Sequence, residues 1–185
     1  MQEFHDGMPD DVVRYPMVPI RDVVVFPYTV VRFKIGRHPS VVALQKALAT
    51  DRIIFLATQH DATLEEPNPG DVYRVGTLAR IAQHLQLADG NIKVQVEGLE
   101  RAKAIRIDED GDYWQAVIRR TNQPTERSPR INALVGRLTS LIDQFVRQNP
   151  ENVDNLHSDL QIDDPSRLAD TVASHLKINV EDKQG

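Results

Sequence analysis

The sequence predicts an α+β protein, in which a small closed or half-open β barrel with one early helix is followed by an α-helical subdomain. Apolar residues recur at every second position in several short runs between residues 30 and 120, which is the spacing of half-buried strands. Turn residues divide these runs from one another. Beyond residue 121 the apolar spacing changes to three and four, which is the spacing of a helix packed along one face.

The first predicted strand is the run Val23–Phe26, which consists of β-forming residues without a polar alternation. This pattern is typical of a strand covered on both faces. Pro19 and Pro27 lie on either side of the run and lack the amide donor that a central strand needs, so we expect it to pair over a short span only. A second strand is predicted over Val30–Ile35.

A helix is predicted at about residues 39–50, because Pro39 suits a position in the first helical turn. Ile53–Ala57 is predicted to be a short inner strand, and the acids, prolines and glycine of His60–Asp71 predict a loop. One face of the helix should be buried, since three apolar residues recur at helical spacing: Val41, Leu44 and Leu48.

The clearest hairpin lies between Thr77 and Gly98. Asp89-Gly90 should form a two-residue turn, because such turns need a positive φ and glycine adopts it without a steric penalty. Gly98 should interrupt the return strand as a bulge or bend. The residues expected to face inward are Ala79, Ile81, Leu85 and Leu87 on the first strand, and Ile92, Val94 and Val96 on the second.

The strand pattern resumes over Ala102–Ile107, turns at residues 109–112 and ends with Tyr113–Arg120. After a linker with two prolines, a helix is predicted whose apolar stripe is widened by Val135 and Ile142. The stripe consists of Ile131, Leu134, Leu138, Leu141 and Phe145.

A further helix should begin at Asp164 as N-cap and Pro165 as the first helical residue, with a stripe of Leu168, Val172 and Leu176. Two such helices cannot bury both stripes alone, so we expect them to dock on the barrel, on another chain or on a continuation of this one. The predicted domains are a flexible start (1–14), a β-barrel domain (15–121), a linker (122–129) and a truncated helical subdomain (130–185).

The composition is that of an ordinary soluble protein. Apolar residues make up 41% and charged residues 26% of the 185 residues, and there is no cysteine. No apolar run approaches the roughly 18 residues of a membrane span, so we expect no membrane contact, and the lack of cysteine fits a cytoplasmic location. The net charge of −5, most of it after Arg147, weighs against a nucleic-acid partner.

The sequence shows no motif for catalysis or cofactor binding. None of the nine glycines has the spacing of a Walker A loop or a dinucleotide-binding turn, and no serine lies in a Gly-x-Ser-x-Gly turn. Ser174-His175 are neighbours on a predicted helix, so their side chains point about 100° apart. The six histidines are scattered, and the paired acids lie in turns or caps. We therefore predict no enzyme activity and no catalytic, cofactor or metal residues.

Apolar and aromatic residues at strand ends and turns are the remaining candidates. Pro27-Tyr28 caps the opening strand, Leu85 and Leu87 lie near a hairpin tip, and Tyr113-Trp114 follows a turn. Each of these positions, taken singly, is more often part of a core. Exposed apolar residues rimmed by charge are typical of protein-binding surfaces, so the set as a whole favours a binding function.

The chain carries five distinctive segments in a fixed order: Pro19–Pro27, Gly36-Arg37, Asp71–Ile81, Asp89-Gly90 and Val96–Ala102. Together they resemble the amino-terminal domain of Lon, the ATP-dependent bacterial protease. The similarity is close over about residues 17–120 and looser through the helical tail. Tyr28 stands where a small residue is common in the family, and His38-Pro39 where charged residues are usual.

The resemblance implies a PUA-like β barrel followed by helices, which recruits unfolded or damaged protein substrates and helps to assemble a homohexamer. In this family ATP hydrolysis with Mg²⁺ and the Ser-Lys peptidase dyad belong to later domains. We therefore expect a non-catalytic recognition and assembly domain, without a cofactor of its own, of a protease that degrades misfolded or regulatory proteins. The expected substrate or partner contacts are Pro27, Tyr28, Arg37, His38, Leu85, Leu87, Tyr113 and Trp114.

Two alternatives remain open. PUA-like barrels can bind RNA, so a nucleic-acid-binding module is a second hypothesis, which the acidic balance and the lack of interleaved arginines and aromatics disfavour. A third hypothesis is a purely architectural domain that only holds subunits together.

Overall fold

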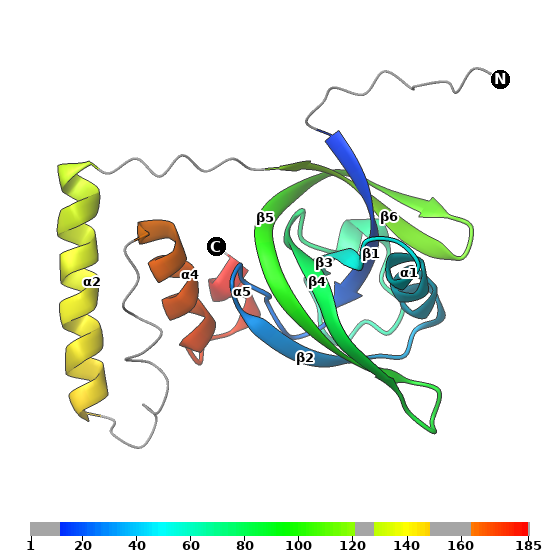
Figure 1. The fold of residues 1–185 in the computed structure, drawn as a ribbon, viewed down its shortest axis with the longest axis horizontal. Coiled ribbons are helices and arrows are strands. Elements are labelled where there is room, and N and C mark those ends of the chain that lie inside the picture. Colours follow the sequence, from blue (N-terminus) through cyan, green and yellow to red (C-terminus); the bar gives the residue numbers. More distant parts are fainter. Residues whose placement is uncertain (1–11, 121–127, 149–163, 185) are drawn as a thin grey trace. The chain divides into compact units, whose positions relative to one another are not determined.

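The computed structural model describes residues 12–120, 128–148 and 164–184 (Figure 1). The chain forms two compact units, which we call the β unit (Met1–Thr121 with Lys177–Gly185) and the helical unit (Asn122–Leu176). Lys177–Gly185 therefore groups with the strands, although the expected helical subdomain included it. The elements are β1 Val12–Ile20, β2 Val30–Ile35, α1 His38–Leu48, β3 Ile53–Thr58, the 3₁₀ turn η1 Pro69–Asp71, β4 Val75–Gln86, β5 Ile92–Asp110, β6 Tyr113–Arg120, α2 Pro129–Gln148, α4 Pro165–His175 and α5 Val180–Gln184.

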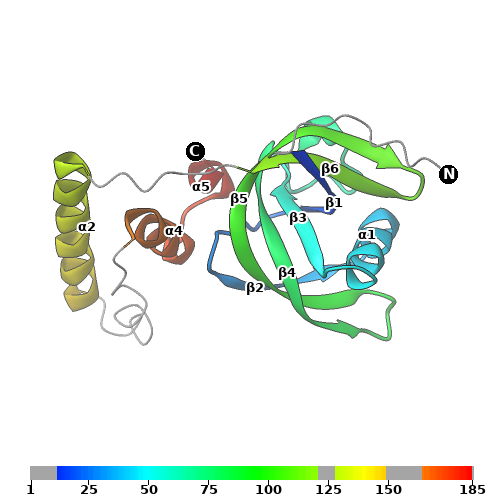
Figure 2. The ribbon, with the colours of Figure 1, turned by 45° about the horizontal axis from the view of Figure 1, so that its top comes forward.

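The six strands form one mixed sheet in the order β2-β5-β4-β3-β1-β6, and β5 also pairs with β6. The pairings thus form a closed circuit from β5 through β4, β3, β1 and β6 back to β5, with β2 outside it (Figures 1 and 2). Closure depends on the 19-residue length of β5, whose first half pairs with β2 and β4 and whose second half pairs with β6. The predicted α+β class is confirmed.

Strand β1 begins at Val12, earlier than the expected start of the β domain at residue 15. It contains both Pro16 and Pro19. Residues 12–17 pair with β6 and residues 17–20 pair in parallel with β3, so each proline lies where the strand has a partner on one side only. A missing amide donor is tolerated at such positions, because the proline nitrogen can face the unpaired side.

The run Val23–Phe26 is not a strand, so that prediction is wrong, although Val25 and Phe26 are buried as expected. The Thr58 hydroxyl donates to the Val23 carbonyl (2.7 Å), and the Thr77 hydroxyl donates to the Val25 carbonyl (2.6 Å). Buried carbonyls need partners, and these two receive them from threonine side chains instead of a neighbouring strand. The run therefore comes after the end of β1 as irregular backbone and is not a strand of the sheet.

The β4–β5 hairpin is confirmed, but its inward face differs from the prediction beyond Ile81. Ala79 and Ile81 are buried. The register then shifts between Ile81 and Gln83, which leaves one extra residue in β4. Because side chains alternate along a strand, this bulge turns Leu85 outward, where 61% of it is exposed. A second register shift lies beside Gly98, where a bulge was predicted.

The tip of this hairpin is a three-residue loop, not the predicted two-residue turn. The Leu87 N–H donates to the Asn91 carbonyl (2.8 Å), and the Gly90 N–H donates to the Leu87 carbonyl (3.1 Å). Gly90 has φ +83°, which is the left-handed residue that closes a three-residue hairpin loop. The second predicted turn is present between β5 and β6, with Gly111 at φ +63°.

Helix α1 packs against the sheet through Ala43, Leu44 and Ala47, which are almost completely buried. Leu44 was predicted to be buried, while Val41 and Leu48 are partly buried at the edge of the same apolar cluster. A second cluster around Met17 and Phe55 lies between β1, β3, β4, β5 and β6. These two clusters form the core of the β unit.

The helical unit contains α2 and α4. In α2 the buried residues are Ile142 and Val146, and more than half of Leu134, Leu141 and Phe145 is exposed. Ile131, Val135 and Leu138 are half-buried, so the covered face is the Val135 and Ile142 side of the predicted stripe. Helix α4 begins as predicted: the Asp164 carboxylate accepts a hydrogen bond from the Ser166 N–H (2.9 Å). Along α4, Leu168 is buried; Leu176, expected on the same stripe, is its C-cap and is exposed.

Candidate functional site

The turn Phe26–Thr29 presents an aromatic ring at the surface. Pro27 is buried and fixes its own φ, and the Thr29 N–H donates weakly to the Phe26 carbonyl (3.4 Å). Tyr28 follows with φ +64°, a conformation that glycine adopts without cost and that is uncommon for a bulky residue. Its side chain is 56% exposed. Strained residues of this kind persist where the surrounding structure holds them, and they gather at functional sites.

Gly98 of β5 holds this turn in place. The Tyr28 N–H donates to the Gly98 carbonyl, and the Gly98 N–H donates to the Thr29 carbonyl, both at 2.8 Å. A Cβ atom at Gly98 would lie 2.1 Å from the Phe26 carbonyl oxygen, so only glycine permits this approach. Two segments that are far apart in the sequence, the turn and β5, therefore fix the backbone conformation of Tyr28 together.

Strand β2 continues directly from this turn, and its first residue, Val30, is 60% exposed. Val30 lies opposite Glu97, and two residues further on the Arg32 Nε donates to the Gln95 Oε1 (2.7 Å). We call Tyr28 and Val30 the apolar anchor. Apolar side chains beside a charged and polar rim are typical of a surface that binds protein.

A depression of about 1060 Å³ lies near the start of α1, between the end of β1 and the end of β2. Arg37, His38 and the buried Trp114 are among its lining residues. Both charge signs are present in the lining: Arg21, Lys34 and Arg37 against Asp22, Glu65, Glu66 and Glu109. The depression is therefore no simple anion or cation site.

Arg37 is tied into one wall of this depression. Its Nη2 donates to the Gln59 Oε1 (2.6 Å) and to the Leu64 carbonyl (3.3 Å). The Gln59 Nε2 donates to the carbonyls of Asp61 and Leu64, both at 3.1 Å, so this buried amide holds the loop and the guanidinium together. Burial lowers the pKa of Arg37, and the nearby positive charge of Arg21 lowers it further, while Glu65 opposes the change. An arginine with these partners acts as a structural clamp.

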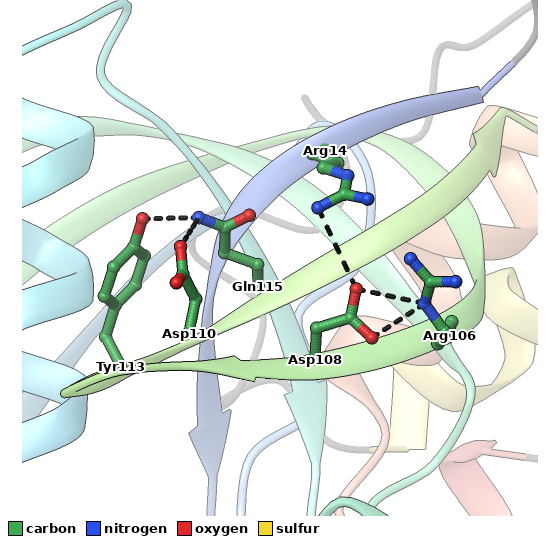
Figure 3. A network of polar contacts seen from close by, with 6 residues as sticks. All are labelled: Arg14, Arg106, Asp108, Asp110, Tyr113 and Gln115. Atoms are coloured by element: carbon green, nitrogen blue, oxygen red, sulfur yellow. Dashed lines mark hydrogen bonds and ion pairs between the residues drawn. The ribbon is translucent and has the colours of Figure 1, made fainter. Parts of the chain in front are cut away.

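A polar network on the outer face of β1, β5 and β6 is shown in Figure 3. Asp108 accepts from the Arg106 Nε (2.7 Å to Oδ1) and lies 4.0 Å from the Arg14 Nη1. The Gln115 Nε2 donates to the Asp110 Oδ2 (3.0 Å) and to the Tyr113 hydroxyl. Exposed pairs of this kind contribute about 1 kcal/mol or less to stability. The network therefore connects neighbouring strands, and we do not interpret it as a reaction centre.

Among the described residues, no three histidine, aspartate or glutamate side chains come together as metal ligands. Within the same residues, no helix has the length and hydropathy needed to cross a membrane.

The eight predicted contact residues do not form one surface. Tyr28, His38 and Leu85 are exposed, Arg37, Leu87 and Tyr113 are half-buried, and Pro27 and Trp114 are buried. Trp114 belongs to the core, so its expected exposure is wrong, and the Tyr113 ring lies 5.9 Å from the Lys46 ammonium. Arg37, His38 and Trp114 line the depression, whereas Tyr28 lies at the start of β2 and Leu85 near the hairpin tip.

Sequence reasoning missed two features of this region. The exposure of Val30 was not predicted, although Arg32 and Lys34 alternate with Val31, Phe33 and Ile35 and so place Val30 on the polar face of its strand. The clamp made by Gln59 also has no sequence signal, since its partners Arg37 and Leu64 are brought together only by the fold.

Comparison with known proteins gives a consistent result. The model of the family "ATP-dependent protease La (LON) substrate-binding domain" matches residues 14–185. A Lon protease of Solibacter usitatus (strain Ellin6076) is 46% identical over 175 residues, which cover 94% of this chain and 22% of that protein. A Lon protease of Rhizobium meliloti (strain 1021) is 41% identical over 174 residues, which cover 92% of this chain and 21% of that protein. The chain thus spans about a fifth of the length of these relatives.

Solved structures show the same fold. The N-terminal domain of a Mycobacterium avium complex Lon protease has a TM-score of 0.70 at 24% identity, over 93% of this chain and 88% of that chain. A Lon N-terminal domain protein from Xanthomonas campestris has a TM-score of 0.52 at 17% identity, over 87% of this chain and 98% of that chain.

Proposed function

Because this chain belongs to the family of Lon substrate-binding domains, we propose that it captures unfolded or damaged protein segments for an ATP-dependent protease. In this proposal the sheet is a PUA-like β barrel, and capture takes place on its surface. Peptide cleavage by a Ser-Lys dyad and ATP hydrolysis with Mg²⁺ are carried out by other domains of a cytoplasmic homohexamer, which degrades misfolded or regulatory proteins. The chain itself has a non-catalytic role.

The observation that supports capture most directly is the apolar anchor. Tyr28 is held outward in an unfavourable backbone conformation by Gly98, and Val30 is exposed two residues later. An exposed aromatic ring on a strained backbone suits a surface that receives apolar segments of other proteins. An unfolded protein exposes many such segments.

Affinity at one anchor is expected to be weak, because an unfolded segment loses conformational entropy when it is ordered on a small surface. Several copies in one assembly would raise the effective concentration of binding sites and compensate for this. The proposed hexamer therefore contributes to recognition as well as to architecture.

The test compares binding of one labelled protein in its unfolded and folded forms to this chain, measured by fluorescence anisotropy. Binding of the unfolded form alone is expected. Tyr28→Gly should weaken it about fivefold, by the loss of an aromatic contact worth on the order of 1 kcal/mol, while the fold is kept because glycine suits the positive φ. Ile105→Ser, at a half-exposed position elsewhere on β5, is the matched control and should bind as the unaltered chain does.

Equal binding to both forms, or no loss with Tyr28→Gly, would contradict this proposal. The two alternatives predict other results. RNA binding that weakens steeply with salt would identify a nucleic-acid module. Strong self-association in sedimentation without any affinity for unfolded protein would identify an architectural domain.

A further inference from the structure

Strand β2 has one free edge within the described part of the chain. It is the terminal strand of the sheet and pairs with β5 alone. In both ribbon views no described strand runs along its other side (Figures 1 and 2). A free edge of this length offers backbone donors and acceptors to any extended chain that can reach it.

The direction of the backbone groups in β2 follows from the turn before it. The Gly98 N–H donates to the Thr29 carbonyl, so Thr29 points its carbonyl toward β5. Successive residues of an antiparallel strand point their N–H and C=O groups to alternate sides. Val31, Phe33 and Ile35 therefore face β5. The remaining residues, Val30, Arg32 and Lys34, direct their backbone groups to the free edge.

The side chains along this edge are apolar at its start and basic thereafter. Val30 is followed on the same face by Arg32 and Lys34, and all three are exposed. Lys34 lies directly opposite Lys93 of β5, an arrangement of like charges that is unfavourable. Asp89 in the hairpin loop is near enough to Lys34 for the two charges to attract, and a further carboxylate on an added strand would offset the positive charge that remains. The edge therefore favours an incoming strand that carries acids.

The same charges oppose pairing between two copies of this chain. If two β2 edges met, the Arg32 and Lys34 of one copy would lie beside those of the other, and like charges on adjacent strands are destabilising. Natural proteins use lysine in this way to prevent edge-to-edge association. Self-association through β2 is thus disfavoured, while an acidic strand is accepted.

The end of β2 also borders a hollow. Phe33, Lys34 and Ile35 are among the residues that line the depression of about 1060 Å³, as are residues at the end of β1. An added strand would project alternate side chains toward this space and toward the basic face of β2. On the face that meets β2, the residues beside Arg32 and Lys34 would be acids, and the end residue beside Val30 would be apolar.

We propose that the free edge of β2 binds a client polypeptide as an added β-strand, with a preference for segments that alternate apolar and acidic residues. This inference rests on the proposed capture function and specifies its mode. Main-chain hydrogen bonds would supply affinity that is independent of sequence, which suits a receptor for many clients. The basic edge and the apolar anchor would supply the selectivity.

The first test uses peptides and the unaltered chain. A short peptide that alternates valine and glutamate should bind at least about tenfold more tightly than one that alternates valine and lysine, because the charges on the edge attract one and repel the other. N-methylation of the glutamate-peptide amides that face β2 should weaken binding about three- to tenfold for each amide, whereas methylation of the amides that face away should have little effect.

The second test examines the edge itself. On peptide binding, amide hydrogen exchange should slow at Arg32 and Lys34 and stay unchanged at Val31 and Phe33, whose amides already face β5. Arg32→Pro should bind the peptide about three- to tenfold more weakly than Arg32→Ala. Both variants lose the side chain and its bond to Gln95, so the difference between them measures the amide.

The outcomes separate the binding mode from the function. If unfolded protein binds but neither N-methylation nor edge protection has the stated effect, the added-strand mode is overturned and capture stands. If unfolded protein does not bind at all, both are overturned. Should Arg32→Pro fail to fold, the peptide and exchange experiments on the unaltered chain still decide the question.

Discussion

Helices α1 and α2 show how differently the two units support an amphipathic helix. Helix α1 is 11 residues long, and it buries Ala43, Leu44 and Ala47 almost completely against the sheet. Helix α2 is 20 residues long with a more pronounced apolar stripe, yet most of Leu141 and Phe145 remains exposed. An apolar stripe therefore shows that a helix has a face to cover. How much of that face is buried depends on what the rest of the chain places against it.

The largest expected effect tests this contrast directly. Leu44→Ala in α1 should lower the free energy of unfolding of the β unit by about 2–5 kcal/mol, because it opens a cavity in a packed core. Leu141→Ala in α2 should change stability by no more than about 0.5 kcal/mol. Trp114 is the single tryptophan and is buried in the β unit, so its fluorescence during denaturation reports that unit alone. Circular dichroism follows the helices. A large decrease in the free energy of unfolding with Leu141→Ala would show that this face of α2 is covered in solution.

A pair of glycines sharpens the same contrast. Gly98→Ala should destabilise the β unit by about 1–3 kcal/mol, because its Cβ would lie 2.1 Å from the Phe26 carbonyl oxygen and the backbone would have to move. Gly136→Ala in α2 should stabilise that helix by about 1 kcal/mol, since a Cβ there meets nothing within 4 Å and alanine favours helix. Thermal unfolding of the two variants checks the opposite signs. Two destabilised variants would mean that α2 packs more closely at Gly136 than it does in this structure.

The smallest expected effect concerns the exposed tip of the β4–β5 hairpin. Hydrogen bonds from the Asn91 side chain and backbone lower the pKa of Asp89 below its ordinary value of 3.8. A carboxyl with a lowered pKa in the folded state stabilises that state above its ordinary pKa, and the contribution is lost as the pH falls through the folded pKa. Asn91→Ala should raise the pKa of Asp89 toward 3.8, measured by NMR titration. Asp61, whose pKa is lowered by Thr63, is the internal control and should not change. An unchanged Asp89 would show that the backbone bond alone sets its pKa.

Much of the β unit could be predicted from the sequence, because periodicity reports which residues are buried. The period of two gave the hairpin, and Asp164-Pro165 gave the start of α4. The run Val23–Phe26 was misassigned for a physical reason. Its burial and its β-forming side chains are real, but threonine hydroxyls satisfy its carbonyls, and the pattern of a sequence does not show which partner a carbonyl finds.

The remaining misses come from single-residue shifts and from tertiary contacts. The bulge after Ile81 turns the side chain of Leu85 to the opposite face of the sheet. No residue type at the bulge predicts it from the sequence. Of the candidate surface, Tyr28 was named from the sequence, but its positive φ was not predicted, because proline at the second position of a turn suits both type I and type II turns and only type II has a positive φ at the third. The free edge of β2 could not be predicted from the sequence, since strand order is set by pairings between distant segments.

The pairing of β1 with β6 has a consequence for how the protein is made. Val12 lies opposite Arg119, so the first half of β1 has no partner strand until more than a hundred further residues have been synthesised. Contacts this distant along the chain slow folding and prolong the time for which apolar strands remain unpaired. A domain proposed to receive incompletely folded chains is therefore itself such a chain for a long part of its synthesis.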